Sequence, residues 1–297
     1  MKPIAVLCIL LSFAFLFTAC AGNGPAATEK TTAPSEAGEP AETAEAGEPA
    51  ETAEPETTEL VSQAQVDRRA FQVYEDHPEL TPVDLGSPAL LPISEDMGQE
   101  YLDRITFLCD SPTYWLWPYG MLKGGDDSTQ LWTGPEGTMT LAYQGSYEIY
   151  DPFDKVERPI REVVELHKPD IMVIALGING ISFMDEEYFT AEYTDLVTSI
   201  QEISPDTILL LQSIYPITPA YRYWGDITNV MITEANSWIL KIAEEHGCRY
   251  LDTFSCLVAQ DGNAKEELMM SDGLHPNKDG LAEVLTYIRT HGYQEKN

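Results

Sequence analysis

From about Glu95 onward, the chain alternates short apolar runs with longer runs in which apolar residues recur at helical spacing. Four of the short runs have the length and composition of buried parallel strands, at residues 105–109, 170–176, 207–212 and 250–254. Three amphipathic runs predict helices, around residues 189–203, 232–243 and 281–288. Strands that alternate with helices form a parallel sheet covered on both faces. We therefore predict an α/β fold with three layers, α/β/α, around a central and mostly parallel sheet.

Residues 125–150 have the least regular pattern of this region. Within them, residues 130–132 and 138–143 have a pattern typical of extended chain. We predict a further strand here, followed by a hairpin-like excursion.

The first 20 residues have the pattern of an export signal. An apolar run of 14 residues covers positions 4–17, and small residues lead from it to Cys20. A membrane-spanning helix needs about 20 residues, so we expect a signal peptide at 1–19, with an N-terminal membrane anchor as the alternative. The Phe-Thr-Ala-Cys sequence at 17–20 resembles the lipobox of bacterial lipoproteins, with Phe in place of the usual Leu. The resemblance implies a lipidated Cys20 and a secreted lipoprotein, anchored on the extracytoplasmic face of the cell membrane.

The following residues, to position 60, have the composition of a disordered linker. Ala, Glu, Pro, Thr and Gly dominate, aromatic residues are missing, and AGEPAETAE occurs twice in tandem, at 37–45 and 46–54. Such a segment cannot bury enough apolar surface to offset the entropy of ordering it. We expect Cys20 and an acidic tether at 20–60, an approach segment at 61–94 and the folded domain at 95–297.

The chain is strongly acidic, with 17 Lys+Arg against 49 Asp+Glu and a formal net charge of −32 over 297 residues. Residues 21–60 carry −9 and residues 1–20 carry +1, which leaves −24 for the rest of the chain. Proteins that bind nucleic acid need a basic face. The charge therefore excludes nucleic acid as a partner and disfavours anionic polymers; we also expect a monomer.

Cysteines are few for an exported protein. Beyond Cys20 and one cysteine in the signal, the chain has Cys109, Cys248 and Cys256. The last two flank the predicted strand at 250–254, which at about 3.3 Å per residue holds them farther apart than the roughly 7 Å that a disulfide allows. We expect free thiols and no disulfide framework.

Polar residues stand where the predicted strands end, and ligands of such sheets bind beyond the carboxyl ends of the strands. Ser111 follows the first strand, Asn179 follows the second, and Asp272 and His275 lie in the loop before the last helix. These are the parts of an acyl-transfer site. We predict Ser111 as nucleophile, His275 as its base, Asp272 as the group that holds the imidazole tautomer, and Asn179 as a donor to the oxyanion.

These residues resemble the SGNH (GDSL-type) hydrolase family, named for Ser, Gly, Asn and His in four separated blocks. The first block, usually Gly-Asp-Ser, appears as FLCDSPTYW with Ser111; the third, Gly-x-Asn, appears as LGING with Asn179; the last, Asp-x-x-His, appears as SDGLHPN with Asp272 and His275. The similarity extends over about 95–293. It implies the family's flavodoxin-like fold and its activity on ester bonds.

The sequence departs from the family pattern at two blocks. Cys109 replaces the first glycine of the first block, and the second block, whose glycine amide joins the oxyanion hole, is not clear. Gly137 in GPEGTMT is our choice for that glycine, with Gly134 and Gly145 as alternatives.

Several of these residues also allow other interpretations. Ser111 followed by Pro112 fits a helix N-cap, which is compatible with catalysis. Asp272 and His275 could bind a metal, but no further ligand stands at metal-ligand spacing beside them, so we predict no metal. Cys109 is a second possible nucleophile, although its place at the strand end favours a buried, inert thiol.

Aromatic residues cluster after two of the predicted strands. Such residues usually belong to the core, but near strand ends some of them can line a cleft and stack on sugars. They are Tyr114, Trp115, Trp117 and Tyr119 after the first strand, and Tyr215, Tyr221, Tyr223 and Trp224 after the third.

The sequence therefore predicts an extracytoplasmic serine esterase or deacylase that needs no cofactor. Its substrate would be a small-molecule or carbohydrate ester, including O-acetyl or other acyl groups on sugars. Two alternatives stay open: an O-acyltransferase that uses the same residues, and a non-catalytic binding lipoprotein on the same scaffold.

Overall fold

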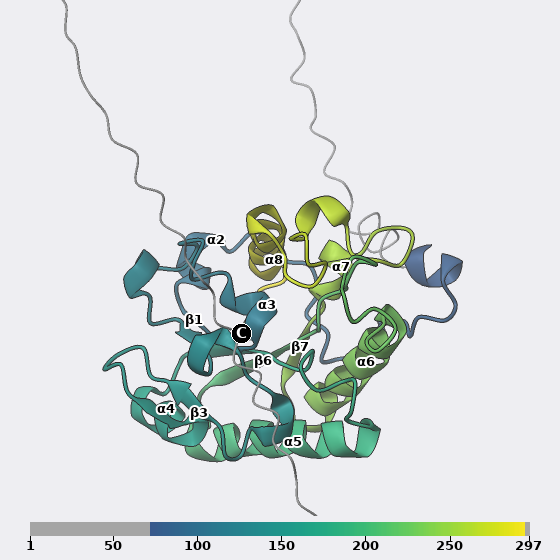
Figure 1. Ribbon diagram of the computed structural model, residues 1–297. Helices are drawn as coiled ribbons and strands as arrows, with labels where there is room; N and C mark the ends of the chain where they lie inside the picture. Colours follow the sequence, from purple (N-terminus) through teal and green to yellow (C-terminus); the bar gives the residue numbers. More distant parts are fainter. Residues whose placement is uncertain (1–71, 295–297) are drawn as a thin grey trace, which may run out of the picture. The chain divides into compact units, whose positions relative to one another are not determined.

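The central sheet has five strands, all parallel to their neighbours, in the order β2-β1-β5-β6-β7. Figure 1 labels β1, β6 and β7 of this sheet. The computed structural model describes residues 72–294, so the predicted signal peptide, Cys20 and the linker lie outside the described residues. The strands are β1 (Ile105–Cys109), β2 (Leu131–Trp132), β5 (Ile171–Ala175), β6 (Ile208–Gln212) and β7 (Arg249–Leu251). The predicted parallel α/β sheet is confirmed.

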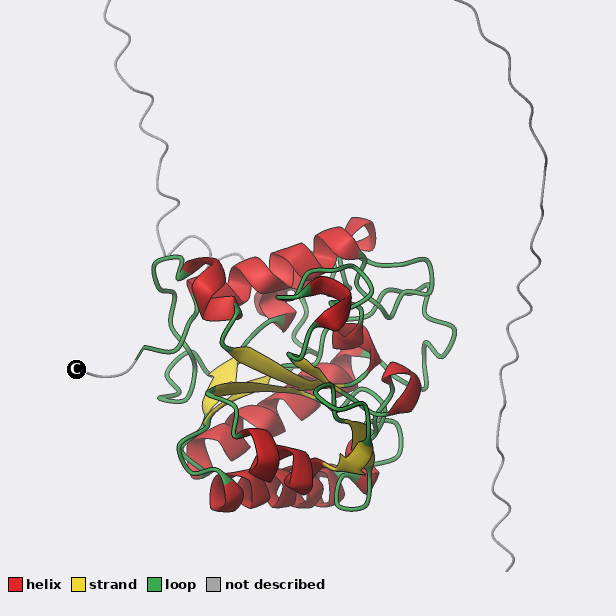
Figure 2. Ribbon diagram, turned by 90° about the vertical axis from the view of Figure 1, so that its left-hand side faces the viewer, coloured by secondary structure: helices red, strands yellow, loops and turns green. Residues whose placement is uncertain are grey.

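Helices cover both faces of this sheet, which gives the three predicted layers (Figure 2). Side chains alternate across β1, so that Leu108 joins the hydrophobic core on one face while Phe107 and Cys109 join the core on the other. The first face carries α4 (Ile160–His167), α5 (Glu186–Ile203) and α6 (Asn229–Glu245), and the second carries α2 (Gly98–Leu102) and α8 (Lys278–Thr290). Two short helices, α3 (Ser111–Tyr114) and α7 (Phe254–Leu257), follow β1 and β7.

The long helices begin at polar residues that cap them. Asp185 accepts a hydrogen bond from the backbone N–H of Tyr188, and Thr228 accepts one from that of Met231. Asn277 accepts two, from the first turn of α8. These caps satisfy N–H groups that have no partner within the helix. The start of α8 is thereby fixed three residues after His275.

Two sequence predictions need correction. Residues 138–143 are not a strand: Leu141–Tyr143 form a 3-10 turn, η3, because Leu141 and Ala142 bury their side chains in the core beside α5 instead of pairing. The antiparallel pair of this region comes later, as β3 (Glu148–Tyr150) and β4 (Glu157–Pro159). The last strand is shorter than predicted, since β7 ends at Leu251 and the chain turns into α7 at Phe254. The remaining 3-10 turns are η1 (Gly125–Asp127), η2 (Pro135–Gly137) and η4 (Glu266–Leu268).

The described part of the approach segment packs against the outer edge of the sheet. Leu90 forms a parallel bridge to Tyr250 of β7, and the N–H of Leu91 donates to the Tyr250 carbonyl at 2.9 Å. Val73 and Leu80 are buried in the core. This segment therefore covers a strand edge that would otherwise be open. None of the helices within residues 72–294 combines the length and apolar character needed to cross a membrane.

Candidate active site

Ser111 is the first residue of α3, immediately after β1. Asp110 before it has extended backbone, with φ −95° and ψ −172°, and Pro112 occupies the first turn. Pro fits there because its fixed φ suits a helix start, and because an N–H in the first turn would have no acceptor within the helix. The chain thus turns sharply from strand to helix at Ser111, and the N–H of Ser111, as the first of the helix, has no acceptor within it.

A continuous hydrogen-bonded chain runs from Ser111 through His275 to Asp272. The Ser111 Oγ lies 3.0 Å from Nε2 of His275, and Nδ1 of His275 lies 2.7 Å from Oδ2 of Asp272. Ser111 and His275 are 164 residues apart in sequence. The structure therefore brings together the three residues that the sequence nominated, in the order hydroxyl, imidazole, carboxylate.

The Asp272 carboxylate is held by its own loop. Its Oδ1 accepts backbone N–H groups from Leu274 at 2.9 Å and from His275 at 3.0 Å. Partial burial acts to raise the pKa of Asp272, but the hydrogen bonds from the His275 ring and these N–H groups outweigh it and lower the pKa below its ordinary value. An ionised carboxylate at Nδ1 keeps the proton on that nitrogen and leaves Nε2 free to accept one.

The loop that follows β6 supports the Asp272–His275 turn. The N–H of Thr218 donates to the Gly273 carbonyl at 2.9 Å. Gly273 has φ +73°, and a Cβ there would lie 2.4 Å from Oγ1 of Thr218 and 2.6 Å from the backbone nitrogen of Tyr221. Only glycine fits this position, so the loop that follows β6 and the loop that carries His275 pack backbone against backbone.

Asn179 follows β5, the strand that pairs with β1. The pairing is in register from Ile105–Ile171 to Cys109–Ala175, which brings the two strand exits side by side. The half-buried Asn179 donates from Nδ2 to the Met139 carbonyl at 2.8 Å. A side-chain amide has two N–H groups, so this hydrogen bond orients the amide and uses one of them.

The three candidate glycines differ in their surroundings. Gly137 is buried with φ +72°, and a Cβ on it would lie 2.5 Å from Cγ of Tyr114 in α3. Its N–H donates to the Gly134 carbonyl at 3.1 Å within η2, so its predicted donation to the oxyanion stays a prediction. Gly134 is packed against Thr138 and Tyr147, whereas Gly145 is exposed with open space around it. Close contact with the Ser111 helix distinguishes Gly137 from both.

Asp110 links the two strand exits. It is 4% exposed, and its Oδ2 accepts the N–H of Gly177 at 3.2 Å, two residues before Asn179. Burial raises the pKa of Asp110 to about 7, against the opposing effect of hydrogen bonds from Gly177 and Ile178. This hydrogen bond joins the loops that carry Ser111 and Asn179, and sequence spacing could not have predicted it.

Cys109 is fully buried, as predicted, and its side chain faces the core. Burial raises the pKa of its thiol well above the ordinary value, so the thiol is neutral near pH 7. The alternative of a Cys109 nucleophile is therefore disfavoured. Cys248 and Cys256 are also free, as predicted.

The aromatic residues that follow the strands differ in their surroundings. Tyr215 is buried, and its hydroxyl hydrogen-bonds to Thr113 at 3.1 Å beneath α3, so its role is structural. Trp115 lies edge-on to the His275 ring at a centroid distance of 6.3 Å. Three others are exposed on loops after β1 and β6: Trp117, Tyr223 and Trp224. The contact of Trp115 with His275 was not predicted, because it depends on how the short α3 is oriented.

Among residues 72–294, no group of three or more His, Cys, Asp or Glu side chains is arranged to hold a metal ion. Chemically, the arrangement can remove the proton of the Ser111 hydroxyl, store it on an imidazolium beside a carboxylate, and offer N–H groups to an adjacent negative oxygen.

A family model for GDSL-like lipases and acylhydrolases matches residues 146–282, a span that contains Asn179, Asp272 and His275. Among solved structures, a candidate acylhydrolase of Bacteroides fragilis is 18% identical with a TM-score of 0.47, covering 77% of this chain and 95% of its own. A GDSL-like lipase of Bacteroides thetaiotaomicron is 16% identical with a TM-score of 0.44, covering 77% and 97%. An acetylxylan esterase of Geobacillus stearothermophilus is 16% identical with a TM-score of 0.43, covering 71% and 98%. A search of curated proteins found no match.

Proposed function

We propose that this chain is a serine esterase whose nucleophile is Ser111. Support comes from the family model for GDSL-like lipases and acylhydrolases, which matches residues 146–282. The observation that carries the proposal is the hydrogen-bonded chain from Ser111 Oγ through His275 to Asp272, with separations of 3.0 and 2.7 Å. Both lie within the range that proton transfer between a nucleophile and its base requires.

In the first half of the reaction, Ser111 Oγ attacks the carbonyl carbon of the ester while its proton passes to Nε2 of His275. Asp272 stabilises the imidazolium that forms. The tetrahedral intermediate then collapses, its bond to the alcohol oxygen breaks, and the alcohol leaves with the proton from Nε2. The acyl group is now bonded to Ser111.

In the second half, a water molecule takes the place of the alcohol. His275 accepts a proton from it as it attacks the acyl carbon, and returns that proton to Ser111 Oγ when the carboxylic acid departs. No external oxidant, reductant or cofactor enters this sequence of steps.

The negative oxygen of the tetrahedral intermediate in each half of the reaction needs hydrogen-bond donors. We assign this task to the N–H of Ser111 and to the second N–H of the Asn179 amide, with Gly137 as the remaining family-implied donor. Support for Asn179 comes from its hydrogen bond to the Met139 carbonyl, which fixes the amide before substrate arrives. One such preorganised donor typically contributes about 10²–10³ in rate.

For the substrate, we propose an acyl ester of a carbohydrate, with O-acetyl as the simplest group. Support comes from the aromatic side chains at the same edge of the sheet as Ser111: Trp115 beside His275, and the exposed Trp117 and Trp224. Flat rings of this kind stack on sugar faces. The strongly acidic chain also favours an uncharged substrate over an anionic polymer.

A fluorophosphonate probe and a small aryl acetate test the nucleophile. We expect the purified protein to be labelled once and to hydrolyse the acetate, and the Ser111→Ala variant to lose both activities. His275→Ala should be labelled at least 10²-fold more slowly. If labelling survives Ser111→Ala, the nucleophile lies elsewhere, and a parent protein without labelling or turnover contradicts the proposal as a whole.

We also propose that the enzyme acts outside the cytoplasm, as a lipoprotein anchored through Cys20. Support comes from the sequence alone, in the apolar run and lipobox-like residues that precede Cys20. Membrane fractionation with Cys20→Ser tests this location. The parent should sediment with membranes and the variant should not, whereas equal partition of the two would contradict the anchor.

A further inference from the structure

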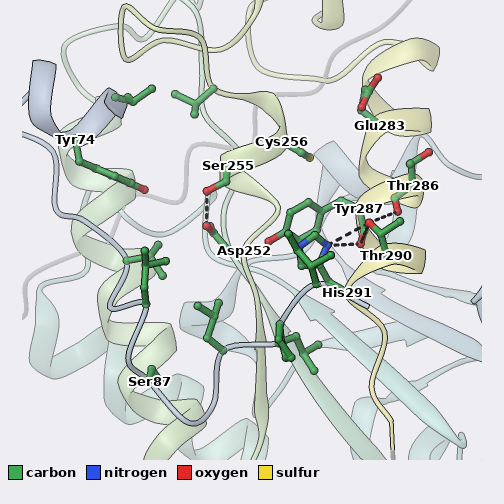
Figure 3. Close-up of a pocket in the computed structure, with 18 of the residues that line it drawn as sticks. Tyr74, Ser87, Asp252, Ser255, Cys256, Glu283, Thr286, Tyr287, Thr290 and His291 are labelled. Carbon is green, nitrogen blue, oxygen red and sulfur yellow. Dashed lines mark hydrogen bonds between the residues drawn. The ribbon is translucent and has the colours of Figure 1, made fainter. Parts of the chain in front are cut away.

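A large cavity lies at the β7 edge of the sheet, apart from the catalytic residues. It has a volume of about 760 Å³ and is bounded by the approach segment, the end of β7 with α7, and one side of α8 (Figure 3). Ser111, Asn179, Asp272 and His275 are not among its lining residues. Two strands lie between β1 and β7, which at about 4.8 Å per step puts the two strand ends roughly 14 Å apart. The cavity has the size of a small-molecule site.

The cavity contains a carboxylate whose hydrogen bonding is incomplete. Asp252 follows β7 and is 6% exposed, and one of its oxygens accepts a hydrogen bond from the Ser255 hydroxyl. The other oxygen, Oδ1, has no hydrogen-bond partner among residues 72–294. A buried polar atom without a partner costs free energy, and a buried charge costs more. Burial accordingly raises the pKa of Asp252 to about 6, so the group is mainly ionised at pH 7.5.

No cation among residues 72–294 forms an ion pair with this carboxylate. Arg249 and Lys265 also line the cavity, but Arg249 donates to the Pro88 carbonyl at 2.7 Å and Lys265 donates to the Cys256 carbonyl at 2.8 Å. Within the described chain, neither forms an ion pair with Asp252. A second carboxylate, Glu283 of α8, stands on the facing wall without an ion pair in the same part of the chain.

Aromatic rings form the walls beside these carboxylates. The Tyr74 ring extends from the approach segment towards Asp252, and Tyr287 of α8 lies on the other side (Figure 3). His291 stacks on Tyr287 at a centroid distance of 3.7 Å and fixes its ring. A carboxylate between aromatic rings is the arrangement that recognises substituted ammonium ions, because the ring face and the carboxylate both attract positive charge while the rings also contact alkyl groups.

We propose that this cavity is a second ligand site, which binds a small organic cation of the substituted-ammonium class. The cation lies with its charge against Asp252 and its alkyl groups against Tyr74. Its positive charge balances the negative charge of the carboxylate, and it occupies the site without contact to Ser111.

Titration calorimetry with choline tests the proposal at pH 7.5. Its neutral carbon isostere, 3,3-dimethylbutan-1-ol, has the same shape without the charge. We expect the protein to bind one choline and to bind the isostere at least tenfold more weakly. Asp252→Asn should weaken choline binding at least tenfold, and Tyr74→Leu at least threefold. Ser111→Ala should bind choline as the parent does, which separates this site from the catalytic one.

Asp279→Asn is the matched control, because Asp279 is an exposed carboxylate of α8 that does not line the cavity. Hydrolysis of an aryl acetate reports folding of the Asp252, Tyr74 and Asp279 variants, and Tyr74→Leu tests the proposal if Asp252→Asn does not fold. The proposal is overturned if the parent does not bind choline, if choline and its isostere bind equally, or if the folded cavity variants bind choline like the parent.

Discussion

Replacing Gly137 by alanine gives the sharpest test of how the site is assembled. The positive φ of +72° costs an L-residue about 1–2 kcal/mol. The new Cβ would also lie 2.5 Å from Cγ of Tyr114, and such overpacking costs a further 1–3 kcal/mol or so. We therefore expect Gly137→Ala to lower the free energy of unfolding by about 2–5 kcal/mol.

The same substitution should reduce activity, because Tyr114 is the last residue of the helix that begins with Ser111. A displacement of about 1 Å at a reacting group costs on the order of 10²-fold in rate. We expect a loss of this size in kcat/KM for an aryl acetate. Urea unfolding and steady-state kinetics on the same preparation measure both effects.

Gly145→Ala is the matched control, since Gly145 is exposed and nothing lies within 4 Å of its Cβ position. It should change stability by less than about 0.5 kcal/mol. Adding Tyr114→Ala to Gly137→Ala should recover at least about 1 kcal/mol relative to the sum of the single changes. If Gly137→Ala unfolds at the same urea concentration as Gly145→Ala, the proposed contact between η2 and α3 is refuted.

Three further variants probe the remaining parts of the site. Asn179→Ala should lower kcat for an aryl acetate by about 10²–10³ with little change in KM, and an unchanged kcat would exclude Asn179 as an oxyanion donor. Asp272→Asn should lower kcat by about 10³–10⁴, as the wrong imidazole tautomer does in serine hydrolases, while fluorophosphonate labelling slows in parallel; rapid labelling would contradict the proposed role of Asp272. Asp110→Asn should gain stability relative to the parent as pH rises from 4 to 8, by at most about 4 kcal/mol. The folded parent keeps the Asp110 proton up to about pH 7, whereas the unfolded chain releases it near pH 4, so this contribution is present below pH 4 and is lost on the way to pH 7. A stability difference that is constant with pH in urea titrations would show that Asp110 does not titrate in this way.

The parts of the fold that could be predicted from sequence are those with a strong period. The run at 105–109 is apolar except for Thr106 and is followed by the polar Asp110, and it is β1 from end to end. Residues 138–143 also looked extended, but the burial of Leu141 is achieved by a 3-10 turn, which has no distinctive period over so short a length. Likewise, the sequence predicted no helix at Ile160–His167, although α4 buries Val163 and Val164.

The candidate site also has parts that the sequence predicted and parts that it did not. Ser111 and Asn179 were predictable because parallel strands place their exits at one edge, and the Asp272–His275 pair was predictable from its spacing in the loop before the last helix. The contacts that orient them were not, since the Met139 carbonyl at Asn179, Trp115 at His275 and Gly137 at Tyr114 depend on the paths of irregular loops. The chemistry of the side chains could be predicted from the sequence, whereas the conformation of the loops between the strands could not.

The close packing of Gly273 against Thr218 and Tyr221 has a consequence for enzyme engineering. The loop after β6 carries Tyr223 and Trp224, side chains suited to choosing a substrate, and the same loop is the support on which the His275 turn rests. The two loops therefore form one exchangeable unit. A graft from a relative that replaces residues 218–224 alone would remove the native contacts that support the His275 turn, so a successful graft should replace residues 270–275 as well.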